Sequence, residues 1–152
     1  CNGEWSPTDS NILSCGFRFL NLEDRTLEPF LDHGLSSIWS PDGKQVAILY
    51  GLDEKGKEPV GIAQVNRDTG EWNWIYEPVN LDRNDPLLHN LVIRPERYYR
   101  IMDWSPDGRY IAFVSLYKNI WASYIFRIDV VTKEIYVLTT QTKNNYAPAW
   151  GP

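Results

Sequence analysis

The stretch SIWSPDGKQVAILY, residues 37–50, is echoed much later by MDWSPDGRYIAFVS at residues 102–115. In both copies the five letters WSPDG precede an apolar run of strand length, which is too short for an ordinary helix. Proline presets φ for a tight turn, aspartate bonds back to nearby backbone amides, and glycine accepts a positive φ. Each copy therefore predicts a β-hairpin whose two strands are joined by a Pro-Asp-Gly turn.

The residues that carry this pattern are predicted to be structural. In the two copies they are Trp39, Pro41, Asp42 and Gly43, and Trp104, Pro106, Asp107 and Gly108. Holding the turn is the simplest role for each aspartate, and chemistry at Asp42 or Asp107 is the less favoured alternative. Ala47 and Ala112, each eight residues after its tryptophan, are expected to allow close packing between sheets.

A second hairpin follows each copy. The segments VGIAQVNRDTGEWNWIY (60–76) and SYIFRIDVVTKEIYVLT (123–139) both read as strand, polar turn, strand. Residues 4–31 follow the same plan with weaker similarity, and they have Thr8-Asp9 where Asp-Gly is expected. The tryptophans that open the units stand at 5, 39, 104 and 150. Four short strands repeated about every 40–50 residues indicate the blades of a β-propeller.

This repeat resembles that of TolB-type β-propellers. The likeness lies in WSPDG, the Lys or Arg after it, the hydrophobic-Ala-hydrophobic run, a second hairpin ending in Leu-Thr, and a new Pro-Ala-Trp. It also resembles the propellers of prolyl-oligopeptidase relatives. It is strong at 36–76 and 100–150 and weak at 4–35, and Gly151 departs from the serine that the pattern expects. The resemblance implies a fold, while propellers of this type serve many unrelated functions.

The predicted architecture is all-β, with antiparallel four-stranded blades in one partial β-propeller domain over residues 1–152. The blades are expected at about 4–35, 36–99 and 100–145, with the start of a further blade at 146–152. Closed propellers usually have 4–8 blades. Three units alone leave apolar sheet faces in water, so we expect a longer polypeptide, a protein partner or a second copy to complete the ring.

Composition and motifs argue against several classes of function. The net charge is −5, from 15 basic and 20 acidic residues with no basic stripe, which disfavours nucleic-acid binding. The sequence has no run of 18 or more apolar residues, so we expect no segment that spans a membrane. The two histidines fall in connecting segments, and no G-x-S-x-G, H-E-x-x-H or zinc-type cysteine spacing occurs. We therefore expect no catalytic residue, no cofactor and no metal, and we interpret the Asp82 and Asp85 region as a solvated loop rather than a calcium site.

The two cysteines are Cys1 and Cys15. One bridge between them is geometrically feasible, although two cysteines do not make a disulfide framework. A leading cysteine also resembles the mature end of bacterial lipoproteins, so Cys1 is a candidate lipidation site, with the boundary of a fragment as the alternative. A lipid at Cys1 is the one membrane contact that we expect, and it implies an exported protein, periplasmic or at the cell surface.

The connection after Tyr76 is unusually long, because 65 residues separate Trp39 from Trp104. Residues 77–100 hold the excess and carry Arg94, Arg97, Tyr98, Tyr99 and Arg100. Tyrosine and arginine are favoured at interface hot spots, so these residues are candidates for partner binding, or for a lid over the central channel. A tolerated insertion with solvated arginines is an equally weighted alternative.

The leading functional hypothesis is a non-catalytic, exported binding or scaffold module, such as an accessory subunit of a bacterial envelope complex. One alternative is the propeller segment of a larger prolyl-oligopeptidase-like serine peptidase. Another is a purely structural subunit that completes a multi-chain assembly.

Overall fold

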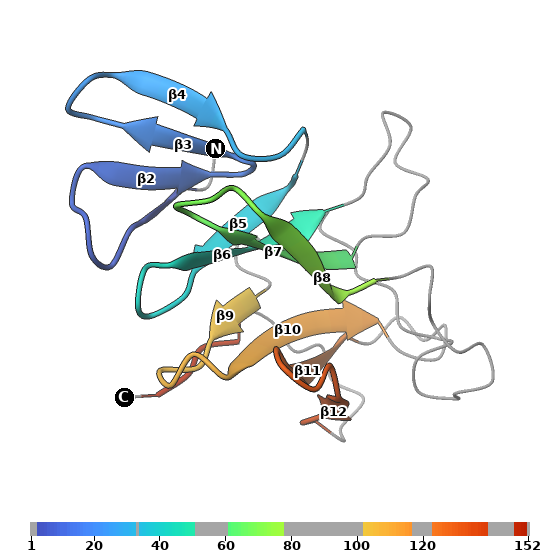
Figure 1. Cartoon of the computed structure of the whole chain (residues 1–152). Helices are drawn as coiled ribbons and strands as arrows, with labels where there is room; N and C mark the ends of the chain where they lie inside the picture. The colour runs from blue at the N-terminus through green and yellow to red at the C-terminus, as the bar shows by residue number, and fades with distance from the viewer. Residues whose placement is uncertain are drawn as a thin grey trace.

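The computed structural model shows three antiparallel four-stranded sheets that follow one another like leaves of a fan (Figure 1). The described residues are 3–32, 34–50, 61–77, 102–116, 123–139 and 148–151. Every regular element in these ranges is a β-strand, which confirms the all-β partial propeller. In the same ranges, no helix has the length and apolar character needed to cross a bilayer.

Each sheet is one blade, and its strands pair in chain order. Blade 1 contains β1 (Gly3–Trp5), β2 (Ile12–Cys15), β3 (Arg18–Asn21) and β4 (Thr26–Pro29). Blade 2 contains β5 (Ser36–Trp39), β6 (Gln45–Tyr50), β7 (Gly61–Asn66) and β8 (Trp72–Tyr76). Blade 3 contains β9 (Met102–Trp104), β10 (Tyr110–Leu116), β11 (Ser123–Asp129) and β12 (Ile135–Val137).

The Pro-Asp-Gly turns have the same geometry in blades 2 and 3. Gly43 and Gly108 have φ values of 69° and 71°, a region where a side chain is strained. Oδ1 of Asp42 accepts hydrogen bonds from Oγ of Ser40 at 2.7 Å and from N of Lys44 at 3.1 Å. The corresponding distances at Asp107, from Ser105 and Arg109, are 2.6 and 3.0 Å. The five-letter phrase thus encodes a complete local structure.

The turn of blade 1 is one residue longer than the other two. Ser6 N donates to Ile12 O, whereas Ser40 N donates to Gln45 O. Because of the extra residue, Asp9 takes the place of the turn aspartate, and its Oδ1 accepts a hydrogen bond from Asn11 N at 3.0 Å. The departure at Thr8-Asp9 is therefore an insertion that keeps the aspartate rather than a loss of it.

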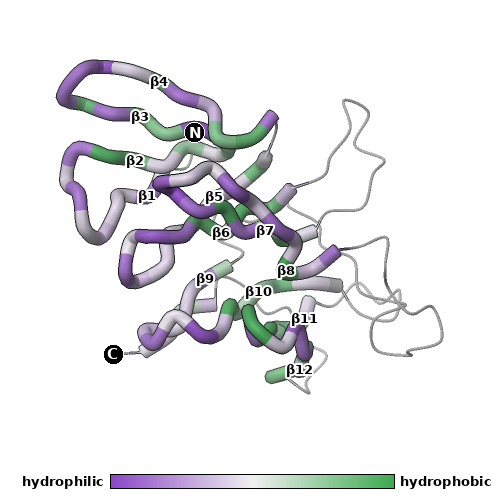
Figure 2. The backbone as a smooth tube through the Cα atoms, viewed as in Figure 1, coloured by the Kyte–Doolittle hydropathy of each residue, from purple (hydrophilic) through white to green (hydrophobic). Residues whose placement is uncertain are grey.

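The middle sheet is buried on both faces, which explains why β6 is apolar throughout. Val46 and Ile48 belong to the cluster shared with blade 1, while Ala47 and Leu49 belong to the cluster shared with blade 3, and all four are fully buried. Figure 2 shows hydrophobic segments running through β2, β6 and β10. Each junction between blades is thus a hydrophobic core.

The two cores differ in size. Among the described residues, the cluster between blades 2 and 3 has fourteen buried members, including Phe113 and Phe126 at 0% exposure. The cluster between blades 1 and 2 has six, supplemented by a stack of Phe19 on Trp39 with ring centroids 5.3 Å apart. Burying apolar area is the main favourable contribution to folding, so blades 2 and 3 share the larger part of it.

Two glycine substitutions test how closely blade 1 packs on blade 2. A Cβ at Gly43 would collide with the side chain of Thr8 in blade 1, whereas Gly70, with φ 71°, has nothing within 4 Å of that position. We expect Gly70→Ala to destabilise by about 1 kcal/mol from backbone strain alone and Gly43→Ala by about 1–3 kcal/mol more. Urea denaturation measures both, and equal losses would contradict the close packing of the turns.

Candidate functional site between blades 2 and 3

Two hydrogen bonds from Trp39 connect blade 2 to blade 1. The backbone N of Trp39, the last residue of β5, donates to Oε2 of Glu4 at 2.8 Å. The indole Nε1 of the same tryptophan donates to the backbone O of Glu4 at 3.0 Å. Glu4 is the residue before Trp5, the tryptophan that opens the preceding blade. We call this pair of hydrogen bonds the tryptophan latch.

The same latch recurs after blade 3. Trp150 N donates to Oδ2 of Asp103 at 2.8 Å, and its Nε1 donates to Asp103 O at 3.1 Å. Asp103 again precedes the tryptophan that opens the blade, Trp104. A carboxylate acceptor makes such a hydrogen bond about twice as strong as a neutral one. An acidic residue before the opening tryptophan therefore holds the tryptophan of the next blade.

The junction between blades 2 and 3 lacks this acidic residue. Ile38 precedes Trp39, and it is buried in the core that the two blades share. Trp104 is 7% exposed, and its Nε1 is a buried donor with no hydrogen-bond acceptor in the described part of the chain. A buried polar group without a partner costs roughly 1–3 kcal/mol. This unsatisfied donor marks the junction as different in kind from its neighbours.

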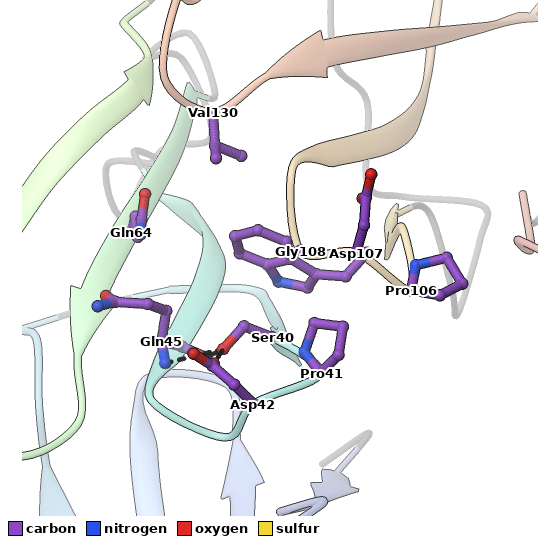
Figure 3. A pocket seen from close by; sticks show the side chains of 10 residues that line it. Ser40, Pro41, Asp42, Gln45, Gln64, Pro106, Asp107, Gly108 and Val130 are labelled. Atoms are coloured by element: carbon purple, nitrogen blue, oxygen red, sulfur yellow. Dashed lines mark hydrogen bonds between the residues drawn. The ribbon is translucent and has the colours of Figure 1, made fainter.

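A pocket of about 210 Å³ opens at this junction, where the Pro-Asp-Gly turns of the two blades lie side by side. Figure 3 shows the turn of residues 40–42, with Gln45 and Gln64, facing the turn of residues 106–108, with Val130 above. Trp104 also lines this pocket. The walls combine carboxylates, carboxamides, prolines and an indole, so charged, polar and apolar groups all line the pocket.

Both aspartates at the pocket favour their charged form. Hydrogen bonds from Ser40 and Lys44 lower the pKa of Asp42. Hydrogen bonds from Ser105 and Arg109 lower the pKa of Asp107 in the same way. A carboxylate stabilised by donated hydrogen bonds remains ionised well into acid. The pocket therefore presents negative charge at neutral pH.

Only some of the candidate residues from the sequence lie in the described part of the structure. The eight turn residues at 39–43 and 104–108 form the hairpins described above, and six of them line the pocket: Pro41, Asp42, Trp104, Pro106, Asp107 and Gly108. The candidate partner-binding residues Arg94, Arg97, Tyr98, Tyr99 and Arg100 lie outside the described residues, as does Cys1. Their predicted roles stay predictions.

Sequence reasoning missed Glu4 and Asp103, although a signal for them exists. The residue before each opening tryptophan is Glu4, Ile38, Asp103 or Ala149, so two of the four are acidic. The significance of that position emerges only from the hydrogen bonds to Trp39 and Trp150.

Neither a protein-family model nor a curated protein matches this sequence. Solved structures do match. TolB from Acinetobacter baumannii is similar over 92% of this chain and 30% of its own length, with 17% identity and a TM-score of 0.57. An oligogalacturonate lyase from Vibrio parahaemolyticus is similar over 84% of this chain and 34% of its own, with 15% identity and a TM-score of 0.57.

The β-propeller domain of the Trilobed protease from Pyrococcus furiosus is similar over 88% of this chain and 34% of its own, with 18% identity and a TM-score of 0.51. The chain thus spans about a third of the length of these structures. Such identities establish the fold alone, and they confirm the resemblance to TolB-type and peptidase propellers at that level.

The latch makes a first prediction for this region. Replacing Glu4 by Ala removes the carboxylate that accepts the Trp39 amide, so we expect the chain to lose about 1–3 kcal/mol of stability. Glu28→Ala, an exposed glutamate on β4 of the same blade, is the matched control and should stay within about 0.5 kcal/mol. Chemical denaturation compares the two, and an equal effect would mean that the latch holds nothing.

The turn aspartates make a second prediction, on pH. Because the folded pKa values of Asp42 and Asp107 lie below the ordinary value of 3.8, their contribution to stability is present at neutral pH. It is lost as the pH falls below about 4, through those lowered values. The double variant Asp42→Asn, Asp107→Asn should be less stable than wild type at pH 7 and should lose less stability on acidification. Denaturation at pH 7 and pH 3 measures this, and parallel pH dependence would refute it.

Proposed function

We propose that this chain is a binding or scaffold module without catalysis of its own, whose blades join further blades supplied by the rest of a longer polypeptide, by a protein partner or by a second copy. The support comes from the open face of blade 1. Trp5 is 52% exposed, whereas Trp39 and Trp104, the equivalent residues of blades 2 and 3, are 5% and 7% exposed. The indole at this position is buried in blades 2 and 3, but it is exposed to solvent in blade 1.

The latches indicate what would cover Trp5. At both observed latches, the opening tryptophan donates to a glutamate or aspartate residue of the preceding blade. In the described part of the chain, the indole N–H of Trp5 donates to no acceptor. A blade whose inner strand carries an acidic residue before its tryptophan is the matching partner, because it offers a carboxylate, a carbonyl and an apolar sheet face together.

A second copy meets one obstacle that another protein does not. The acidic residue of blade 3 that would receive a neighbouring Trp5 is Asp103, and Trp150 of the same chain already occupies it. A ring of two copies therefore requires Trp150 to leave that place. Association of copies is expected to be weaker than capture of a blade whose acidic residue is free.

We assign the chain to an oxidising, exported compartment on the strength of its cysteines. Cys15 is disulfide-bonded, and disulfides persist outside the reducing cytosol. Cys1 is the other cysteine of the sequence. A Cys1–Cys15 bridge and a lipid on the Cys1 sulfur exclude each other, since one sulfur cannot form both bonds. The disulfide of Cys15 supports export, while a lipid at Cys1 stays a prediction.

The second candidate function is the propeller of a larger serine peptidase. Its support is the likeness to the Trilobed protease propeller and to an acylaminoacyl peptidase, the latter at 18% identity and a TM-score of 0.50. In that case the nucleophile would lie outside these 152 residues, because the sequence has no G-x-S-x-G. Activity-based labelling of the full-length gene product with a fluorophosphonate distinguishes the two candidates, since the label reacts with the activated serine of a serine hydrolase and a module without catalysis does not take it.

Association in solution tests the proposed function. We expect the purified chain to form a complex larger than a monomer, and Trp5→Ser to weaken that association by about tenfold or more, because a buried tryptophan is a typical hot spot. Light scattering coupled to size-exclusion chromatography over a range of concentrations gives the mass. Trp72→Ser is the matched control, since Trp72 is 44% exposed but lies on the outer strand β8.

A well-folded wild-type monomer at every concentration would exclude a second copy as the source of the further blades. An equal effect of both tryptophan substitutions would remove Trp5 as its basis.

A further inference from the structure

The two junctions that blade 2 makes can be compared position by position. Arg67 N donates to Lys44 O at 3.0 Å in blade 2, and Val130 N donates to Arg109 O at 3.0 Å in blade 3. Lys44 and Arg109 both follow the glycine of a Pro-Asp-Gly turn. Arg67 and Val130 therefore occupy the same place in successive blades, directly after the third strand.

At the junction of blades 1 and 2, that place holds a guanidinium. Nη2 of Arg67 lies 3.2 Å from Oδ2 of Asp9, the turn aspartate of the preceding blade. Oδ1 of Asp9 is already engaged by the turn itself, through Asn11 N. One carboxylate oxygen thus holds the turn, while the other binds an arginine that reaches across the junction.

At the junction of blades 2 and 3, the carboxylate is present and the arginine is not. Oδ1 of Asp42 is engaged within its own turn by Ser40 and Lys44, but its Oδ2 accepts no hydrogen bond from any residue that the structure describes. Val130 stands where the guanidinium would come from. Asp42 and Val130 are both walls of the pocket (Figure 3).

The volume and the other walls of the pocket fit the guanidinium group that is absent at this junction. Its volume is about 210 Å³, whereas a water molecule in the liquid takes up about 30 Å³, so a planar group of several atoms fits. Asp107 adds a second carboxylate, and neither lysine nor arginine is among the lining residues. Gln45 and Gln64 offer carboxamide oxygens, and Trp104 and the prolines offer flat apolar surfaces.

The buried indole of Trp104 is an independent sign that the junction lacks a component. Its Nε1 has no acceptor in the described part of the chain, whereas the equivalent nitrogens of Trp39 and Trp150 donate to backbone carbonyls. That nitrogen is closed off from solvent, so an acceptor on a ligand reaches it only if the packing around it opens. A ligand that brings a carbonyl beside its cationic group would satisfy this donor as well.

We propose that the pocket between blades 2 and 3 binds a guanidinium group, supplied from outside by an arginine side chain or by a free guanidinium compound. A guanidinium is a planar fork of donors that pairs with carboxylates and stacks on indole faces, which matches these walls better than the compact, strongly hydrated ammonium of lysine. The site reproduces, with an external ligand, the ion pair that Arg67 and Asp9 make within the chain.

Titration of the 152-residue chain with agmatine tests the proposal. We expect saturable binding by calorimetry, weakened by about tenfold or more in Asp42→Asn, because a hydrogen bond to a charged group is lost. Asp24→Asn is the matched control, since Asp24 is also a turn aspartate that accepts hydrogen bonds from a backbone amide and a hydroxyl, but in blade 1. This control should bind agmatine as the wild type does.

A second variant keeps the test informative if Asp42→Asn folds poorly. Val130→Arg installs the guanidinium at the position of Arg67, so it should fill the pocket and abolish agmatine binding. Val131→Arg is its control, because Val131 adds the same charge at a side chain that is 77% exposed. Circular dichroism verifies that each variant retains its β-sheet.

The source of the guanidinium is distinguished by a second ligand. N-acetyl-arginine-N′-methylamide carries peptide carbonyls, so if protein arginines are the natural occupants it should bind more tightly than agmatine and shift the indole N–H resonance of Trp104. Equal binding of both ligands, without that shift, would point to a free guanidinium compound.

Three outcomes would overturn the proposal: no saturable agmatine binding by the wild type, equal binding by Val130→Arg, or equal affinity for agmatine and putrescine, the diamine of the same chain length and charge.

Discussion

The structure depends on covering the apolar faces of its sheets, and the tryptophans Trp39 and Trp150 are in addition hydrogen-bonded to the blade before them. A sheet with two apolar faces has no stable place in water, and β6, fully buried on both sides, shows this constraint most clearly. Hydrophobic contact brings neighbouring sheets together without direction, whereas the hydrogen bonds from Trp39 to Glu4 and from Trp150 to Asp103 fix their relative position. Core and latch together turn a repeated sequence into a regular fan of blades.

Variation at a few equivalent positions gives the junctions different characters. Glu4 and Arg67 provide charged contacts where blade 2 meets blade 1, while Ile38 and Val130, at the same places one blade later, are apolar. The carboxylate of Asp42 persists because the turn requires it, with or without a partner for its second oxygen. When a repeat loses the arginine of such an ion pair, the aspartate is retained because the turn needs it. The retained carboxylate can then bind a ligand.

The fold could be predicted from the sequence because its decisive features are local. Proline, aspartate and glycine specify the hairpin turns within five residues, and Gly43 and Gly108 have the positive φ that such a turn needs. The candidate site could not be predicted, because its components come together only when blades stack. Glu4 lies 35 residues from Trp39, and Asp9 lies 58 residues from Arg67. The single inserted residue in the first turn also hid Asp9, since direct alignment of the repeats places Thr8 against Asp42.

The unequal junctions have a consequence for how the fan responds to its surroundings. Blades 2 and 3 meet through the larger apolar cluster and no tryptophan latch, so their association should weaken on cooling, as hydrophobic attraction does. Blades 1 and 2 meet through a smaller cluster, the tryptophan latch and the partly exposed pair of Arg67 and Asp9, and added electrolyte should weaken that pair. Cooling and added electrolyte would then weaken different contacts, which lie on opposite sides of the middle blade.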